Sequence, residues 1–205
     1  MLKAVLFDID GVLLDSFESN FLFFEALFRK TGFAPPTREE YKQMFHTPMW
    51  DTIKSVTKLD DDKKIEEIWN LARGGKFDTQ PPKLSGGVAS TVKALNQKYS
   101  LAIVTSRVKE YMFEGPLETL KPCFKIAIGY EDTENHKPHP EPLLLAASQL
   151  SVPPGECVYI GDVENDLLAA RAAGMKCILY TPNKINGADA LTSDFEAIPD
   201  LVKTL

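Results

Sequence analysis

The chain has 205 residues, of which 44% are hydrophobic and 25% charged, and its formal net charge is −6 at pH 7. This length suits one medium-sized globular domain or a domain that carries an insertion. The acidic balance, without a basic stripe, argues against nucleic-acid binding, and no apolar run approaches the roughly 20 residues that a membrane span needs.

The three cysteines, Cys123, Cys157 and Cys177, lie far apart in apolar surroundings. We interpret them as reduced core thiols in a reducing compartment rather than as a metal site, because no CxxC pair is present. The N-terminus leads directly into a predicted strand instead of a signal peptide. Together these features predict a cytoplasmic protein.

The first predicted strand covers residues 2–9 and leads into two aspartates, Asp8 and Asp10, followed by Gly11. At positions i and i+2 of extended backbone the two carboxylates point the same way, with Cα atoms roughly 6.6 Å apart. Their repulsion is costly unless a cation neutralises them or one carboxyl holds a proton. A bound cation or a shared proton would each be chemically useful, so the pair indicates a functional site. The alternative interpretation is that the two carboxylates are simply solvated in a loop.

Residues 15–83 contain helical stretches and no convincing strand. The first stretch places four phenylalanines at helical spacing, from Phe17 to Phe28, and this apolar stripe needs a partner. Pro81 and Pro82 then mark a turn back toward the sheet. We therefore predict an all-helical module at 15–83, inserted into a Rossmann-like core that is formed by residues 1–14 and 84–205.

The rest of the chain alternates apolar runs with helical patterns. Further strands are predicted at 99–106, 124–130, 156–162 and 175–181, and helices at 88–98, 139–150 and 164–174. Strands that alternate with helices predict an α/β fold with a doubly wound parallel sheet. In such sheets, ligands bind beyond the carboxyl ends of the strands.

Polar residues follow the second strand and precede the helix at 139–150. Thr105, Ser106 and Arg107 end the strand, and their hydroxyls, with backbone N–H groups opening a following helix, could bind a phosphate oxygen. A helix N-cap is the alternative explanation for these hydroxyls. Lys137, in a loop stiffened by Pro138, would supply positive charge that an acidic protein otherwise lacks near an anion.

The strand at 156–162 ends in Asp162, and Asp166 follows one helical turn later. Gly161 allows close backbone approach, and Asp162 could complete an oxygen-rich site for a hard cation such as Mg²⁺. Each feature has an ordinary explanation alone. Four strand ends that carry such residues in one sheet nevertheless indicate a shared site.

These motifs resemble, in order and spacing, the four motifs of the haloacid dehalogenase superfamily of phosphotransferases. They are DIDGVLLDS, VTS, the KP of HKPHPEP, and GDVENDLLAARAAG. The resemblance covers nearly the whole chain. The helical insertion is similar to the cap of the subfamily that contains phosphoglycolate phosphatase and β-phosphoglucomutase.

The resemblance implies a role for each motif residue. Asp8 would be the nucleophile that forms an aspartyl-phosphate, and Asp10 the general acid and then the base. Mg²⁺ would be held by Asp8, the backbone carbonyl of Asp10 and Asp162, with Gly161 and Asp166 in support.

The phosphoryl oxygens would be bound by Thr105, Ser106 and Lys137. The implied function is a Mg²⁺-dependent phosphatase for a small phosphorylated metabolite, similar to phosphoglycolate or a sugar phosphate. We expect no nucleic-acid or membrane partner, and the sequence does not distinguish a monomer from a dimer.

Alternatives remain within and outside the superfamily. Asp10 argues against a dehalogenase, because a halide leaving group needs no proton. A β-phosphoglucomutase-like enzyme is disfavoured because Asn20 stands where those mutases carry histidine, and an inorganic pyrophosphatase of the superfamily stays open. A receiver-like signalling module is a weak alternative. The phosphorylated aspartate of such a module ends an interior strand, whereas Asp8 lies at the end of the first strand.

Substrate choice should depend on residues of the helical insertion that face the site. Phe17 and Asn20 are candidates there, although packing within the insertion is the favoured role of the phenylalanine stripe. Arg107 would reach either a substrate anion or an acidic residue of a helix. His46 is interpreted as structural.

Overall fold

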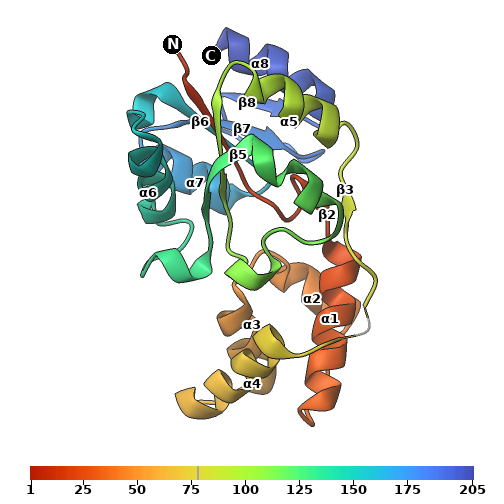
Figure 1. Ribbon diagram of the computed structural model, residues 1–205. Coiled ribbons are helices and arrows are strands. Elements are labelled where there is room, and N and C mark those ends of the chain that lie inside the picture. The colour runs from red at the N-terminus through yellow and green to blue at the C-terminus, as the bar shows by residue number, and fades with distance from the viewer. Residues whose placement is uncertain (78) are drawn as a thin grey trace.

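The computed structural model describes residues 1–77 and 79–205. Its centre is a six-stranded parallel sheet with strand order β5-β4-β1-β6-β7-β8 (Figure 1). The strands are β1 (Ala4–Phe7), β4 (Ser100–Val104), β5 (Phe124–Ile128), β6 (Cys157–Gly161), β7 (Lys176–Tyr180) and β8 (Ala190–Thr192). The five predicted strands are confirmed, and β8 extends one edge.

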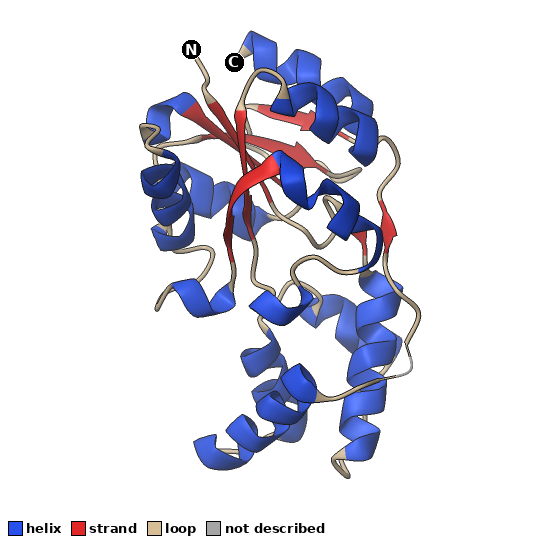
Figure 2. Cartoon of the chain, in the orientation of Figure 1, coloured by secondary structure: helices blue, strands red, loops and turns tan. Residues whose placement is uncertain are grey.

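Helices cover both faces of this sheet (Figure 2). The helices α6 (Glu141–Leu150) and α7 (Glu164–Ala172) pack on one face, and α5 (Val88–Asn96) and α8 (Ile198–Thr204) on the other. Two separate hydrophobic clusters result, one on each side of the strands. The predicted doubly wound α/β fold is therefore confirmed.

The central strand β1 explains why its sequence is apolar at every position. Residues 4–7 are fully buried, and their side chains enter the two clusters alternately, because helices cover both faces. β1 pairs with β4 on one side and β6 on the other. Residues that follow β1, β4 and β6 therefore meet at the middle of the sheet's carboxyl edge.

The four helices between residues 17 and 74 form a helical module with its own hydrophobic cluster (Figure 1). They are α1 (Phe17–Lys30), α2 (Arg38–Met44), α3 (Met49–Thr57) and α4 (Asp62–Gly74). The phenylalanine stripe packs here: Phe24 and Phe28 are buried in the cluster, and Phe17 lies against Tyr41 and Phe45.

Two short strands connect the helical module to the sheet. β2 (Leu14–Asp15) pairs antiparallel with β3 (Lys83–Leu84), so the outgoing and returning segments lie side by side. The sequence did not indicate these strands, because two residues carry no periodicity. The division into core and helical insertion near these positions stays a prediction.

The segment after β4 differs from expectation. The predicted helix N-terminus next to Thr105 is wrong: two 3₁₀ segments, η1 (Lys109–Tyr111) and η2 (Gly115–Cys123), occupy this part of the chain. Pro116 and Pro122 lack the N–H groups that a regular α-helix would use in this segment.

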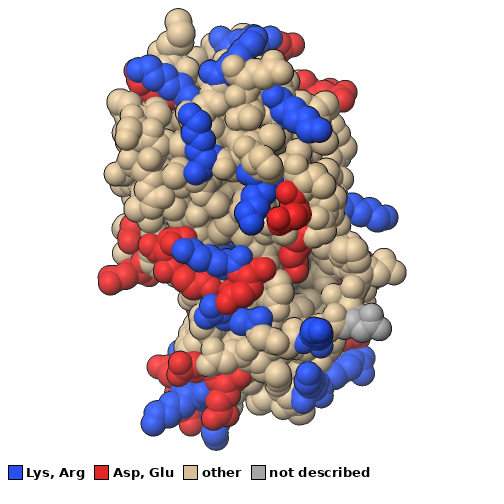
Figure 3. Space-filling view, in the orientation of Figure 1, with Lys and Arg blue, Asp and Glu red and all other residues tan. Residues whose placement is uncertain are grey.

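The surface and the cysteines agree with the composition. On the face shown in Figure 3, basic and acidic side chains are interspersed and form no continuous basic area. Among the described helices, none is both long and apolar enough to cross a bilayer. The three cysteines are free thiols.

The helical module's cluster generates a stability prediction. Phe28→Ala should lower the free energy of unfolding by about 3–5 kcal/mol, because it removes a fully buried ring and leaves a cavity. Urea titration followed by circular dichroism measures the change. Lys42→Ala, at an exposed position of α2, is the control, and an equal effect of the two substitutions would contradict this account.

Candidate active site

A buried ion pair joins Asp8, which follows β1, to Lys137, in the loop before α6. The Lys137 ammonium donates to Asp8 Oδ2 at 2.8 Å, and the side chains are only 8% and 7% exposed. Lys137 also donates at 2.8 Å to Asp166 Oδ1 and to the Tyr159 hydroxyl. The Ile9 N–H donates to Asp8 Oδ1 at 2.8 Å. Both oxygens of Asp8 are thus oriented by fixed donors.

Burial and charge act in opposite directions on these groups. Burial raises the pKa of Asp8 to about 6, although Lys137 opposes the shift. Burial alone would lower the pKa of Lys137, but Asp166 and Asp8 hold it above its usual value, so the ammonium stays charged. A permanent cation therefore lies against the carboxylate of Asp8.

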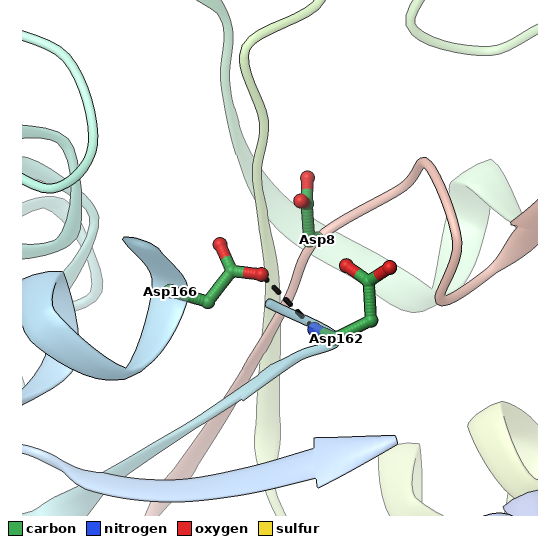
Figure 4. A group of neighbouring side chains, drawn as sticks. All are labelled: Asp8, Asp162 and Asp166. Carbon is green, nitrogen blue, oxygen red and sulfur yellow. Dashed lines mark hydrogen bonds between the residues drawn. The ribbon is translucent and has the colours of Figure 1, made fainter. Parts of the chain in front are cut away.

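Asp162 and Asp166 complete a group of three carboxyls with Asp8 (Figure 4). The backbone N–H groups of Asp162 and Val163 donate to Asp166 Oδ2 at 3.0 and 3.3 Å. Asp166, at the start of α7, therefore has partners for both oxygens. In contrast, Asp162 Oδ1 is buried and has no hydrogen-bond donor among the described residues.

Two glycines provide the space for these carboxyls. A Cβ atom on Gly161 would lie 2.3 Å from the Cβ of Asp166, and one on Gly11 would lie 2.2 Å from Asp162 Oδ2. The φ angle of Gly11 is also +77°, which disfavours other residues. The sequence predicted that Gly161 allows another group to approach its backbone closely, and in the structure that group is the Asp166 side chain.

The donor set fits a hard divalent cation. Asp8, Asp162 and Asp166 each offer one oxygen, and these oxygens lie within 4.8 Å of one another. Burial, together with Asp166 and Asp8, raises the pKa of Asp162 to about 9, and a cation bound beside this carboxyl would favour its ionised form. Oxygen ligands of this kind suit Mg²⁺.

Asp10 has a separate cationic partner. The Arg107 guanidinium binds both carboxylate oxygens, with Nε–Oδ2 and Nη2–Oδ1 distances of 2.8 and 2.7 Å. Ser16 and Asn20 also donate to Asp10 Oδ1. Burial would raise the pKa of Asp10, but Arg107 and these donors hold it below its usual value. The two neighbouring aspartates are therefore neutralised by different cations.

Arg107 is itself fixed on its other side. Its Nη1 donates to Glu114 at 2.7 Å and to the Tyr111 carbonyl at 2.9 Å, and the side chain is 8% exposed. The sequence left a substrate anion and an acidic residue of a helix open as partners. In the structure Arg107 bridges Asp10 and Glu114.

Thr105 and Ser106 lie at the end of β4 and line the same cavity as Asp8. The buried Thr105 hydroxyl accepts a hydrogen bond from the Arg107 N–H at 3.3 Å, which fixes the turn after the strand. Hydroxyls at this place can meet an anion in the cavity, although the helix expected behind them is absent.

A cavity of about 360 Å³ separates these groups from the helical module. Asp8, Asp10, Lys137 and Asp166 line its base, and Asn20, Tyr41 and Phe45 line the side of the helical module. Phe17 is not among the lining residues, so its predicted contact with the site is not supported.

Several site residues were not identified from the sequence. Tyr159, inside β6, donates to the Val104 carbonyl at 3.0 Å and accepts a hydrogen bond from Lys137. The one feature of the sequence that could have indicated it is a phenol within a buried strand. Ser16 and Glu114 carried no signal. His46, interpreted as structural, lines the cavity with its Nε2 3.6 Å from Asp162 Oδ2.

This arrangement of a parallel sheet, clustered carboxylates and an inserted helical module defines a hydrolase of the haloacid dehalogenase type. The family model described as "Haloacid dehalogenase-like hydrolase" matches residues 5–180. The chain belongs to this family, as its motifs indicated, and it is an enzyme.

Particular relatives are similar over most of the chain. Pyrophosphatase PpaX of Bacillus pumilus is 30% identical over 85% of this chain and 81% of its own length. Phosphoglycolate phosphatase of Salmonella choleraesuis is 36% identical over 85% of this chain and 64% of its own length. The crystal structure of CbbY from Rhodobacter sphaeroides in complex with phosphate has a TM-score of 0.81 at 24% identity and covers 97% of this chain and 96% of that one. The last likeness establishes the fold.

The raised pKa values of Asp8 and Asp162 predict a pH dependence of stability. A carboxyl whose pKa is higher in the folded than in the unfolded state stabilises the fold when protonated. This contribution is present below about pH 4 and is lost as the pH rises through about 6 for Asp8 and about 9 for Asp162. In EDTA, Asp162→Asn should therefore raise the free energy of unfolding at pH 8, and raise it less at pH 5.

Urea titrations at pH 5 and pH 8 test this expectation. Asp60→Asn, at an exposed position, is the matched control. If Asp162→Asn is neutral or destabilising at pH 8 in EDTA, the carboxyl is not the buried, unpartnered group described above.

Proposed function

We propose that this hydrolase is a Mg²⁺-dependent phosphatase that acts on a small phosphorylated metabolite through an aspartyl-phosphate. One observation carries the proposal: the Asp8 carboxylate is fixed by Lys137 at the base of a cavity, while neighbouring Asp10 is held by a different cation, Arg107. Two adjacent carboxyls in separate environments can act in different roles. The family match and the relatives named phosphatases support the same conclusion.

In the first step, an oxygen of Asp8 attacks phosphorus, the Asp8–phosphorus bond forms, and the bond from phosphorus to the alcohol oxygen breaks. Asp10 gives a proton to the departing alcohol; because Arg107 favours the ionised form of Asp10, this carboxylate must first take up that proton from water. Lys137 places positive charge beside the attacking carboxylate, which reduces its repulsion from the phosphoryl group. Thr105 and Ser106 donate hydrogen bonds to the phosphoryl oxygens.

In the second step, water attacks the aspartyl-phosphate and Asp10 takes up its proton, so inorganic phosphate leaves and Asp8 is regenerated. Arg107 supports this step, because it favours the ionised form of Asp10, which can accept a proton. Asp8, the Asp10 carbonyl and Asp162 would hold Mg²⁺, with Asp166 in support. The bound ion would supply positive charge against the phosphoryl oxygens.

The helical module would act as a cap that limits the access of water to the cavity. The contacts that link it to the core include His46 with Asp162, Tyr111 with the Ala72 carbonyl, and Arg73 with Glu110. The paired strands β2 and β3 would be its hinge. Cytoplasmic location stays a prediction.

The names of the relatives suggest other substrates and one other reaction. Inorganic pyrophosphate and phosphoglycolate are the substrates that those names imply, and a mutase remains the alternative among enzymes of this fold. Asn20, at the position of the mutase histidine, donates to Asp10 at 3.0 Å. Product analysis separates the reactions, since a mutase moves phosphate within one sugar faster than it releases phosphate to water.

The nucleophile provides the direct test. Asp8→Asn should reduce Mg²⁺-dependent hydrolysis of p-nitrophenyl phosphate by at least about 10³-fold, because the amide cannot form the intermediate. Asp60→Asn should keep full activity, and circular dichroism should show both variants folded. Unchanged turnover by Asp8→Asn would refute the assignment.

A further inference from the structure

The positive groups in the cavity are already paired. Among the described lining residues, the only lysine and arginine are Lys137 and Arg107, each less than a tenth exposed. Lys137 binds Asp8 and Asp166, and Arg107 binds Asp10 and Glu114. Giving Arg107 to a substrate anion would leave a buried carboxylate unpaired, which is costly.

The side of the helical module adds no further cation. None of the described lining residues between positions 19 and 80 is lysine or arginine. The Nε2 atom of His46 lies 3.6 Å from Asp162 Oδ2, so a positive charge on this imidazole would be paired with that carboxylate. A second anionic group on the substrate would therefore lie in the cavity without a counter-charge.

Aromatic rings form two parts of the wall instead. Phe23 contacts Phe77 and Tyr111, with ring centroids 4.9 and 5.8 Å apart, and the Tyr111 hydroxyl is bound to the Ala72 carbonyl. Tyr41 and Phe45 form a second group, 6.2 Å apart. All five rings line the cavity. These parts of the wall favour a flat apolar group, and the polar side chains beside them, such as Asn20, Thr79 and Gln80, are uncharged and do not compensate a buried charge.

From these observations, and resting on the proposed phosphatase activity, we propose that the preferred substrate is a phosphate monoester of an uncharged alcohol with a flat apolar ring. The phosphoryl group lies at the Asp8 end, and the ring lies between the aromatic groups of Phe23 and Phe45. A volume of about 360 Å³ holds a group of this size. The small anions glycolate and inorganic phosphate would lie there as poorly compensated leaving groups.

Matched substrates test the charge and the ring separately. Benzyl phosphate and 4-carboxybenzyl phosphate differ by one carboxylate, and ethyl phosphate removes the ring without adding charge. We expect kcat/KM for benzyl phosphate to exceed the values for the other two by about tenfold or more, measured as Mg²⁺-dependent phosphate release. Phosphoglycolate and pyrophosphate should be as poor as 4-carboxybenzyl phosphate.

A substitution at the wall tests the missing counter-charge. Gln80 is exposed and lines the cavity, so Gln80→Lys can add an ammonium without disturbing the buried ion pairs. Relative to the uncharged control Gln80→Met, it should raise kcat/KM for 4-carboxybenzyl phosphate at least about threefold and leave benzyl phosphate unchanged.

The outcomes separate this inference from the proposed function. Faster turnover of phosphoglycolate, pyrophosphate or 4-carboxybenzyl phosphate than of benzyl phosphate would overturn the inference and leave the phosphatase activity intact. A preference for glucose 6-phosphate over benzyl phosphate would likewise overturn the inference that the substrate's ring is apolar. Failure to hydrolyse any of these compounds, p-nitrophenyl phosphate included, would refute the proposed function itself.

Discussion

The ammonium of Lys137 is the interaction on which the rest of the site depends. It lies between Asp8 and Asp166, so one side chain connects the loop after β1, the loop before α6 and the first turn of α7. Without it, three buried carboxyls would face one another with no positive charge among them, and burial would favour their neutral forms. Asp8, the proposed nucleophile, and the oxygens proposed to hold a metal thus share one organising cation.

Arg107 repeats this solution at Asp10, which therefore has a cationic partner different from that of Asp8. The site therefore contains two ion networks whose members do not exchange partners, and each aspartate has its own protonation behaviour. The arrangement carries a cost in stability at Asp162, whose Oδ1 has no donor among residues 1–77 and 79–205. Local stability would favour an amide or an apolar residue there, and this conflict is of the kind expected at a functional position, in agreement with the proposed role of Asp162.

The sequence predicted the fold and the motif residues because both are local properties. Unalternating apolar runs identified the central strands, and the residues that follow them had to meet at one edge of a parallel sheet. The short pieces were missed: β2, β3 and β8 are too brief for a pattern, and the prolines in η2 replaced an expected helix. The partners of Arg107 could not be predicted, because Asp10 and Glu114 meet it only through the tertiary fold. The hydrogen bond from Lys137 to the Tyr159 hydroxyl depends on the tertiary fold in the same way.

The pairing of β2 with β3 has a consequence for how the molecule is built. Leu14 lies opposite Leu84 and Asp15 opposite Lys83, so the two ends of a segment of more than sixty residues are adjacent in space. Once these ends are paired, the entropic cost of closing the loop grows only slowly with the number of residues between them. The sheet therefore tolerates changes of length and sequence between these strands. Specificity can diverge in that segment while Asp8, Lys137 and Asp162 stay in place.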